Sequence, residues 1–170
     1  MAHEPRRSTR VDPLASHHIR TAFSSGVEPL DRHFRTQAGQ DARKNIAAPF
    51  VLVLLDGAIA GYCTLSSTAV PAPELPGDII RRLARYPLIP ATLLGRLAVD
   101  HPYRGLRHGR FLLADALFRS VGSEITSFAV VVDAKDGDAR RFYEREGFLP
   151  FPDQPMKLFR PMADIGALFR

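Results

Sequence analysis

The sequence predicts an α/β fold with a mixed central sheet and flanking helices. Strand patterns and helix patterns alternate along the second half of the chain, and an Asp-Gly pair separates two strand-like runs in the first half. Alternating strands and helices are typical of βαβ units with parallel strands, whereas a hairpin adds antiparallel strands. A sheet that contains both kinds of pairing is mixed.

Length and composition fit one globular domain over residues 1–170. Of these residues, 45% are hydrophobic and 24% are charged, which is ordinary for a globular protein. A domain of this length buries well over half of the surface that its unfolded chain exposes. No apolar run approaches the ~20 residues of a membrane span, and the N-terminus has no signal-peptide pattern. We therefore expect a cytoplasmic protein that does not contact a membrane.

The first part of the chain predicts a leader and a helix. Residues 1–13 are polar and basic, so we expect a flexible leader or a peripheral first strand. Apolar residues then recur at helical spacing over Leu30–Lys44, with Ser24 or Ser25 as the cap. The outer face of this helix is basic and carries Arg32, Arg35, Arg43 and Lys44.

A hairpin and a short helix follow. Phe50–Leu55 and Ala58–Ser66 flank Asp56-Gly57, which predicts a hairpin, because glycine accepts the positive φ angle of a type I′ turn. The proline-rich residues Val70–Pro76 predict a loop. Gly77–Tyr86 then predicts a short helix with an apolar side and an arginine side.

The second half of the chain carries the βαβ unit. We expect, in chain order, a strand over Ala91–Val99, a turn over Arg104–Gly109, a helix that ends near Ser120, a strand over Thr126–Asp133, a helix from Asp136 to Gly147, and closing strands over Phe148–Phe151 and Met156–Phe159. The continuous apolar run of Thr126–Asp133 is typical of a strand covered on both faces.

The turn between the strand that ends at Val99 and the next helix has the features of a phosphate-binding site. N–H groups in the first turn of a helix lack an intrahelical partner, and the helix dipole adds partial positive charge there. A pyrophosphate fits such a place. Charge-assisted donors and glycines supply the rest of the pattern: Arg104, Gly105, Arg107, Gly109 and Arg110. The same pattern also fits a plain strand–helix turn with solvated arginines.

This turn resembles the acetyl-CoA motif of the GNAT acetyltransferases, which reads Gln/Arg-x-x-Gly-x-Gly/Ala. Arg104 takes the first position and Gly109 the last, whereas Arg107 stands where the motif has glycine. That departure matters only if the backbone there needs a positive φ angle or a very close approach. The resemblance implies the GNAT fold, acetyl-CoA as the acetyl donor, no metal, and a donor site formed by Leu97, Ala98, Val99, Arg104, Gly105, Leu106, Arg107, His108, Gly109 and Arg110.

In this family the strand before the motif splays away from its neighbour and admits the pantetheine arm. The resemblance implies that the backbone of Leu97 and Val99 binds the pantetheine and thioester region. A backbone amide near these residues would then polarise the acetyl carbonyl in the manner of an oxyanion hole.

A second stretch, Asp138–Phe148, resembles the family signature Ala-x-x-Phe-Tyr-x-x-x-Gly-Phe. In that signature the tyrosine lies near the thioester sulfur, which implies that Tyr143 is the catalytic acid for the departing thiolate. The alternative is a core tyrosine whose hydroxyl is merely satisfied. For a general base the sequence offers only Glu28 and Asp100 as weak candidates, and water serves equally well, because an α-amine with a pKa of ~7.7–8.0 is partly neutral near pH 7.

Residues 20–160 resemble the GNAT toxins of bacterial toxin–antitoxin pairs. The similarity rests on Phe23–Asp31, Ala60–Leu65, Leu75–Gly77 and Arg85–Ala91. It implies that the acceptor is the α-amine of an aminoacyl-tRNA, that acetylation inhibits translation, and that the partners are a ribbon–helix–helix antitoxin and a second copy in a homodimer. The net charge of +5 is consistent with an RNA partner.

Other functions remain open at this level. The chain fits an acetyltransferase for a small amine or a protein N-terminus, and it also fits a non-catalytic CoA-binding regulatory module. A plain nucleic-acid-binding domain is disfavoured, because no basic stripe with interleaved aromatic residues is present. The single cysteine, Cys63, lies in an apolar strand pattern and is expected to be buried and inert, and the histidines have no zinc-site spacing.

Overall fold

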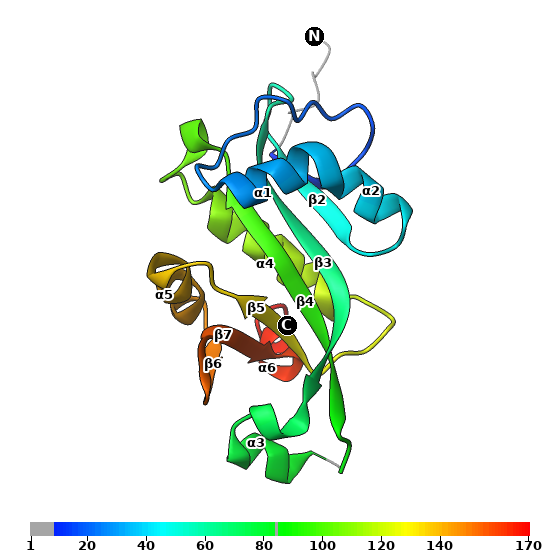
Figure 1. Cartoon of the computed structure of the whole chain (residues 1–170), viewed down its shortest axis with the longest axis vertical. Coiled ribbons are helices and arrows are strands. Elements are labelled where there is room, and N and C mark those ends of the chain that lie inside the picture. The colour runs from blue at the N-terminus through cyan, green and yellow to red at the C-terminus, as the bar shows by residue number, and fades with distance from the viewer. Residues whose placement is uncertain (1–8, 84) are drawn as a thin grey trace. The chain divides into compact units, whose positions relative to one another are not determined.

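The computed structural model of the chain describes residues 9–83 and 85–170. Within them, seven strands form one sheet in the order β1-β2-β3-β4-β5-β7-β6 (Figure 1). The chain divides into two compact units: unit 1 covers the described residues up to Thr64 together with Arg96–Asp115, and unit 2 covers Leu65–Gly95 and Ala116–Arg170. The α/β class is confirmed, and a single domain stays a prediction.

Unit 1 begins with a strand at the edge of the sheet. β1 (Arg10–Pro13) pairs antiparallel with β2 (Ala48–Val53), in the register that joins Arg10 to Val53 and Pro13 to Phe50. The alternative of a peripheral first strand is therefore correct for these residues. The flexible leader expected before them falls on residues 1–8, which lie outside the described residues.

The helix predicted over Leu30–Lys44 is present as three consecutive helical segments: α1 (Glu28–Arg32), a π-helical turn (His33–Gln37) and α2 (Ala38–Arg43). The predicted caps are wrong, because Val27 is the N-cap and makes no side-chain capping bond. Ser25 is used elsewhere: its Oγ–H and its N–H both donate to Asp31 Oδ1, at 2.6 and 2.8 Å.

An aromatic core lies beneath these helices. Phe34 stacks on Tyr62 with ring centroids 4.2 Å apart, and Phe23 meets Phe34 edge-on at 4.7 Å. The buried members of this cluster are Phe23, Phe34, Ala38, Val51, Val53, Tyr62 and Ala98. The cluster joins the helix to strands β2, β3 (Ile59–Pro71) and β4 (Leu88–Val99).

The hairpin between β2 and β3 is confirmed, but its turn differs from the predicted type I′. The N–H of Gly57 donates to the carbonyl of Leu54, and the N–H of Leu54 donates to the carbonyl of Ala58, both at 2.9 Å. Gly57 has a φ angle of +87°, whereas Asp56 is not among the residues with positive φ. A type I′ turn needs positive φ at both central residues; here Asp56 Oδ1 instead accepts from the N–H of Ala58 at 2.9 Å.

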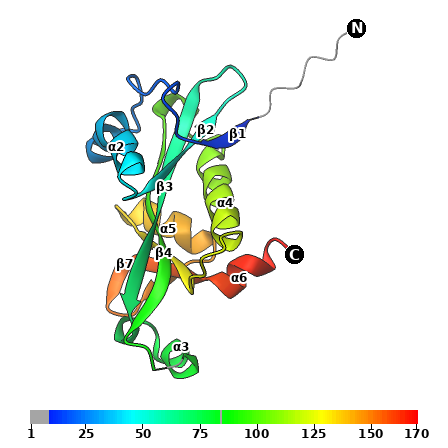
Figure 2. The same cartoon turned by 90° about the vertical axis from the view of Figure 1, so that its right-hand side faces the viewer.

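Unit 2 carries the parallel part of the sheet. β4 pairs parallel with β5 (Ala129–Asp133), β5 pairs antiparallel with β7 (Gln154–Pro161), and β7 pairs antiparallel with β6 (Leu149–Phe151). The mixed sheet predicted from the sequence is therefore confirmed. The helices of this unit are α3 (Gly77–Arg82), the end of α4 (His108–Val121), α5 (Gly137–Arg145) and α6 (Met162–Ala167), with a 3₁₀ turn at Ala72–Glu74 (Figure 2).

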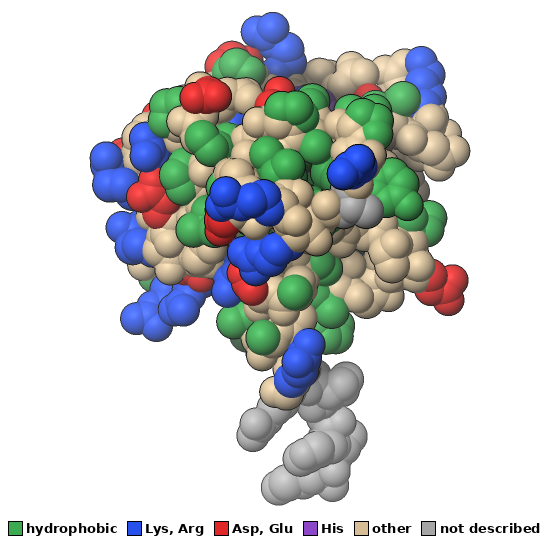
Figure 3. Space-filling view, turned by 90° about the horizontal axis from the view of Figure 1, so that it is seen from below, with side chains coloured by type: hydrophobic (Ala, Val, Ile, Leu, Met, Phe, Trp, Pro, Cys, Tyr) green, Lys and Arg blue, Asp and Glu red, His purple; other side chains and the backbone are tan. Residues whose placement is uncertain are grey.

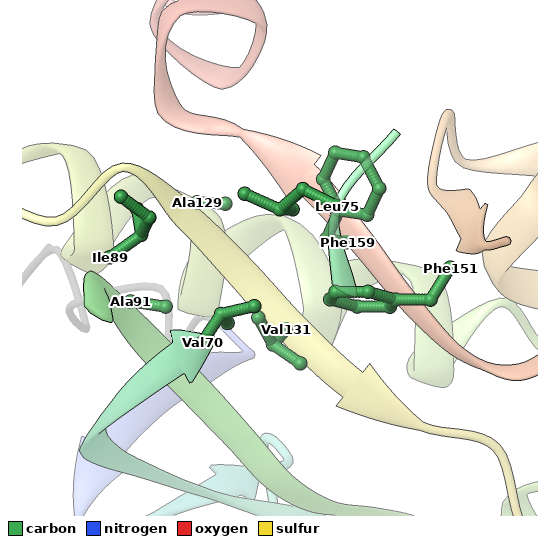
Figure 4. Packing of buried hydrophobic residues seen from close by; sticks show 8 residues of the cluster. All are labelled: Val70, Leu75, Ile89, Ala91, Ala129, Val131, Phe151 and Phe159. Carbon is green, nitrogen blue, oxygen red and sulfur yellow. The ribbon is translucent and has the colours of Figure 1, made fainter. Parts of the chain in front are cut away.

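A second apolar core fills unit 2. Figure 4 shows Phe151 and Phe159 close to each other, with centroids 5.1 Å apart, beside Val131 of β5. The remaining buried members are Val70, Leu75, Ile89, Ala91 and Ala129. Ala129 and Val131 of β5 belong to this core, and Val130 and Val132, which point to the other face of the strand, are buried as well, as a strand covered on both faces requires.

Several predictions for unit 2 are wrong. β3 continues to Pro71, so the predicted Val70–Pro76 loop starts later. α3 ends at Arg82, because Leu83 is already extended with φ −90° and ψ 148°; Ala84 lies outside the described residues. The sequence analysis also missed α6, a short helix that buries Ile165. Within the described residues, no helix combines the length and the apolar character that crossing a membrane requires.

Candidate active site

The donor-binding stretch predicted from the sequence lies in unit 1, where β4 leads through a turn into α4. Val99 ends the strand, a 3₁₀ turn spans His101–Tyr103, and α4 begins at His108. All residues predicted to bind the donor belong to this one strand–turn–helix junction: Leu97, Ala98, Val99, Arg104, Gly105, Leu106, Arg107, His108, Gly109 and Arg110.

Asp100 fixes the beginning of the turn. Its Oδ1 accepts hydrogen bonds from the N–H of Ser24 at 2.9 Å and from that of His101 at 3.2 Å. The N–H of His101 also donates to the carbonyl of Ser24 at 2.8 Å. This carboxylate is one of the two general-base candidates from the sequence. It connects the loop before α1 to the turn over residues 100–107 between β4 and α4, which we call the donor turn after its predicted role. Glu28, the other candidate, is exposed and lies 3.4 Å from Arg35 in an ion pair.

Two residues of the turn have left-handed backbone conformations. The φ angle is +75° at Gly105 and +63° at Arg107. The carbonyl of Arg107 accepts the N–H of Phe111 at 3.1 Å and so opens the hydrogen-bond ladder of α4. The position where the family motif has glycine therefore does need a positive φ angle, and Arg107 adopts it at a cost of about 1–2 kcal/mol.

The first turn of α4 has N–H groups that can donate hydrogen bonds to a phosphate. The N–H groups of His108, Gly109 and Arg110 precede the first residue with a helical partner, so the helix itself does not satisfy them. His108 Nδ1 lies 3.0 Å from the carbonyl oxygen of Tyr103. Because a carbonyl only accepts, Nδ1 carries the proton in this bond, which holds the helix start against the 3₁₀ turn.

Two glycines beside this junction differ in the space around them. A Cβ added to Gly109 would lie 3.6 Å from Val99 Cγ2 and 3.9 Å from Leu97 Cδ2, which is ordinary contact and explains why glycine and alanine share this motif position. A Cβ added to Gly61 would lie 2.8 Å from the carbonyl oxygen of Ala98. Sequence reasoning did not single out Gly61 as a site residue, although it lies in the Ala60–Leu65 stretch that carried the resemblance.

β4 extends beyond its pairing with β5. The parallel register joins Ala91–Leu94 to Ala129–Val132, and β4 continues to Val99. The backbone groups of Leu97 and Val99 therefore lie past the end of this ladder. The expected splaying of this strand and the binding of the pantetheine arm by its backbone stay predictions.

Tyr143 lies in unit 2, on α5. Asp136 caps the start of this helix, since its Oδ1 accepts from the N–H of Ala139 at 2.8 Å, which confirms the predicted helix start. The Tyr143 side chain is buried and its ring lies against those of Phe142 and Phe148, at 5.2 and 5.4 Å between centroids. Its catalytic role stays a prediction.

Unit 1 also holds a buried polar cluster that sequence reasoning missed. His33 Nε2 donates to Asp41 Oδ2 at 2.9 Å, and the His33 ring is nearly parallel to that of Tyr62. Burial lowers the pKa of His33, the bond with His33 lowers the pKa of Asp41, and burial raises the pKa of Tyr62. The described residues contain no group of three or more His, Cys, Asp or Glu side chains placed to hold a metal ion.

A mixed sheet whose fourth strand runs through a glycine- and arginine-containing turn into a helix defines an acyl-CoA-dependent acyltransferase of the GNAT type. The family described as "Acetyltransferase (GNAT) family" matches residues 14–148, so the chain belongs to this family. The chain is 34% identical over 166 residues to a protein of Mycobacterium tuberculosis (strain ATCC 25618 / H37Rv) named "tRNA-acetylating toxin". The aligned region covers 96% of this chain and 95% of that protein.

Solved structures agree with this assignment. A tyrosine-to-phenylalanine mutant of KacT matches with a TM-score of 0.89 and 25% identity, over 95% of this chain and 99% of KacT. The structure described as "AtaTR bound with AcCoA" matches with a TM-score of 0.82 and 25% identity, over 96% of this chain and 99% of that chain. The GNAT fold predicted from the sequence is confirmed.

Proposed function

We propose that this protein transfers the acetyl group of acetyl-CoA to the α-amine of an aminoacyl-tRNA and thereby inhibits translation in the cytoplasm as the toxin of a toxin–antitoxin pair. The observation that carries the proposal is the 34% identity to a tRNA-acetylating toxin over nearly the full length of both chains. The similarity therefore extends well beyond the donor motif.

Acetyl-CoA is the donor in this proposal, and its pyrophosphate binds at the start of α4. The positive φ angles of Gly105 and Arg107 shape the turn that leads into the helix, whose first N–H groups lack helical partners and suit a phosphate. The exposed side chains of Arg104 and Arg107 add charged donors to the phosphates. The pantetheine arm follows the backbone of Leu97–Val99, and the AtaTR structure with AcCoA supports a donor site in this fold.

The reaction is direct transfer in a ternary complex. The neutral α-amine attacks the thioester carbonyl, and a backbone N–H near Leu97–Val99 stabilises the oxyanion that forms. The C–S bond then breaks, and Tyr143 donates its phenolic proton to the leaving thiolate. The attacking nitrogen loses its proton to water, since Asp100 is engaged by two backbone N–H groups. Free CoA and the N-acetylated aminoacyl-tRNA are the products.

The partners in this proposal are a ribbon–helix–helix antitoxin and a second copy of the chain. The antitoxin follows from the resemblance to the GNAT toxins of toxin–antitoxin pairs, and the relative named "tRNA-acetylating toxin" supports the toxin part of that resemblance. The RNA partner is supported by the net charge of +5 and by the exposed arginines on the helix over residues 28–43. Figure 3 shows a different face, seen from below the view of Figure 1, on which blue Lys and Arg side chains are scattered among green hydrophobic and red acidic ones.

The test is acetylation of total charged tRNA with radiolabelled acetyl-CoA. We expect label on tRNA that mild base releases as an N-acetyl amino acid, and no label on deacylated tRNA. Label that appears only on a small amine or a peptide N-terminus, or no transfer at all, would overturn the proposal and favour the small-amine enzyme or the non-catalytic module.

A charge reversal sharpens the choice of acceptor. Arg32 is exposed, pairs only loosely with Glu28 at 3.8 Å, and lies on the outer face of the helix that also carries Arg43. We expect Arg32→Glu combined with Arg43→Glu to abolish acetylation of tRNA while acetylation of a small amine, if the enzyme supports it, is unchanged. If the double variant still acetylated tRNA, the helix face that carries Arg32 and Arg43 would not be the tRNA-binding surface.

A further inference from the structure

The end of α5 is a Schellman motif, and Tyr143 belongs to it. The N–H of Phe148 donates to the carbonyl of Tyr143 at 3.0 Å, and the N–H of Gly147 donates to that of Glu144 at 3.1 Å. Gly147 has the left-handed φ angle of +89° that the motif requires. The contact between the rings of Tyr143 and Phe148 is the hydrophobic contact that accompanies the motif. The position of Tyr143 is therefore set by the closure of this turn.

Arg160 of β7 lies against this turn. Its Nη1 donates to the carbonyl of Glu146, the C-cap residue of α5, at 2.5 Å. A Cβ added to Gly147 would lie 2.8 Å from Arg160 Cζ, so the guanidinium packs directly on the glycine backbone. The backbone of Arg160 is paired with Val130 in the sheet. The side chain thus links the rigid sheet to the last turn of the helix.

The chemistry of this contact favours a cation. The last carbonyls of a helix lack intrahelical partners and carry partial negative charge, and an arginine there satisfies one of them. Arg160 Nε is buried and has no hydrogen-bond partner among the described residues. Burying an unpartnered donor is unfavourable, so the guanidinium keeps this place because of the bond to Glu146 and the packing on Gly147.

We propose that Arg160 is a positioning residue for acetyl transfer: it holds the turn over residues 143–148 against the sheet and so fixes the phenol of Tyr143. This inference rests on the proposed role of Tyr143 as the acid. A catalytic group displaced by about 1 Å can lose on the order of a hundredfold in rate, so a loosened turn lowers turnover without touching the donor site.

The test is a double-mutant cycle with Arg160→Met and Tyr143→Phe, read out as single-turnover acetyl transfer at saturating acetyl-CoA. We expect Arg160→Met to lower the rate about tenfold or more in the wild-type background and to have no further effect when Tyr143 is already Phe, because residues that act as a unit are not additive. The dissociation constant for CoA should stay within about twofold of wild type. Arg141→Met, which removes an exposed guanidinium from the same helix, is the matched control and should leave the rate unchanged.

The conservative variant Arg160→Lys keeps a cation that can reach the carbonyl of Glu146 but lacks the planar group that packs on Gly147. We expect it to recover part of the lost rate. If the methionine variant does not fold, Arg160→Lys replaces it in the double-mutant cycle with Tyr143→Phe. Equal losses with and without the Tyr143 hydroxyl, or a weaker binding of CoA as the main effect, would overturn the positioning role. A Tyr143→Phe variant with full activity would instead overturn the acid assignment itself.

Discussion

Two regions of the molecule use the same backbone conformation for different purposes. In the donor turn, Gly105 and Arg107 have φ angles of +75° and +63°, and in the turn after α5, Gly147 has a φ angle of +89°. An added Cβ at Gly105 would meet no described atom within 4 Å, whereas at Gly147 it would meet the guanidinium of Arg160 at 2.8 Å. One turn is open and the other is packed.

The difference follows from what each turn has to hold. In our proposal the first N–H groups of α4 bind the phosphates of acetyl-CoA, so the turn before them stays open, and its second left-handed position accepts an arginine that adds a charge. The turn after α5 is packed, and we propose that this packing holds the phenol of Tyr143 in one place. Backbone N–H groups that bind a ligand must be accessible to it, whereas a turn that fixes a side chain must pack closely around it.

The largest expected effect on stability is that of Gly147→Ala. A left-handed alanine costs about 1–2 kcal/mol, and overpacking against Arg160 adds about 1–3 kcal/mol. We expect the free energy of unfolding, measured with urea, to fall by about 2–5 kcal/mol. Gly105→Ala is the matched control, and since it adds only the backbone strain, its loss should be about 1–2 kcal/mol. Equal losses in the two variants would contradict the packed turn.

The next effect is on donor binding. Arg104→Ala removes an exposed cation at the donor turn, and a hydrogen bond to a charged group contributes about 1.5–3 kcal/mol. We expect the Kd of CoA, measured by calorimetry, to rise about tenfold to a hundredfold, with an unchanged single-turnover rate at saturation. Arg82→Ala, on α3, should leave the Kd unchanged. A fall in the saturated rate with an unchanged Kd would place Arg104 in chemistry rather than in binding.

The sequence predicted where both turns lie, but it did not predict the backbone conformation of Arg107 or the contact of Arg160. The strand–turn–helix and the end of α5 were found because glycine spacing and apolar periodicity are local signals. The conformation of Arg107 was not, because nothing in an arginine side chain reports a positive φ angle. Arg160 was missed because its bond to Glu146 joins segments that are distant along the chain.

The wrong predictions in the fold have the same origin. Ser25 looked like a helix cap, but its hydroxyl is taken by Asp31 in the folded protein. Asp56-Gly57 gave the hairpin correctly, while the bond from Leu54 to Ala58 lengthens the turn beyond two residues. Tertiary contacts override local preference at both places, so the sequence located the elements better than their ends.

A change of pH affects unit 1 through His33. Burial is the main cause of its lowered pKa, and burial also lowers the pKa of His18. The unfolded chain then binds more protons than the folded protein as the pH falls below the ordinary histidine value of 6.5, so stability decreases in that window. A difference of one pKa unit between the folded and the unfolded state corresponds to about 1.4 kcal/mol of stability. We expect His33→Gln to flatten the loss of unfolding free energy between about pH 7 and pH 5, and an unchanged slope would contradict this origin.

The smallest expected effect is that of Arg107→Gly. Glycine relieves about 1–2 kcal/mol of left-handed strain, while the greater freedom of the unfolded chain offsets about 0.4–1 kcal/mol. The free energy of unfolding should therefore rise by no more than about 1.5 kcal/mol. A clear loss of stability in urea denaturation would show that the arginine side chain has a structural role and that the turn is less open than described.

In our proposal the open turn before α4 binds the donor, and Tyr143 beside the packed turn after α5 supplies the acid. The most direct measurement is single-turnover acetyl transfer to aminoacyl-tRNA by Tyr143→Phe at saturating acetyl-CoA. We expect the rate to fall on the order of a hundredfold or more, with the Kd of CoA unchanged. An unchanged rate would contradict the account, because Tyr143 would then be a core tyrosine and the leaving thiolate would take its proton from another source.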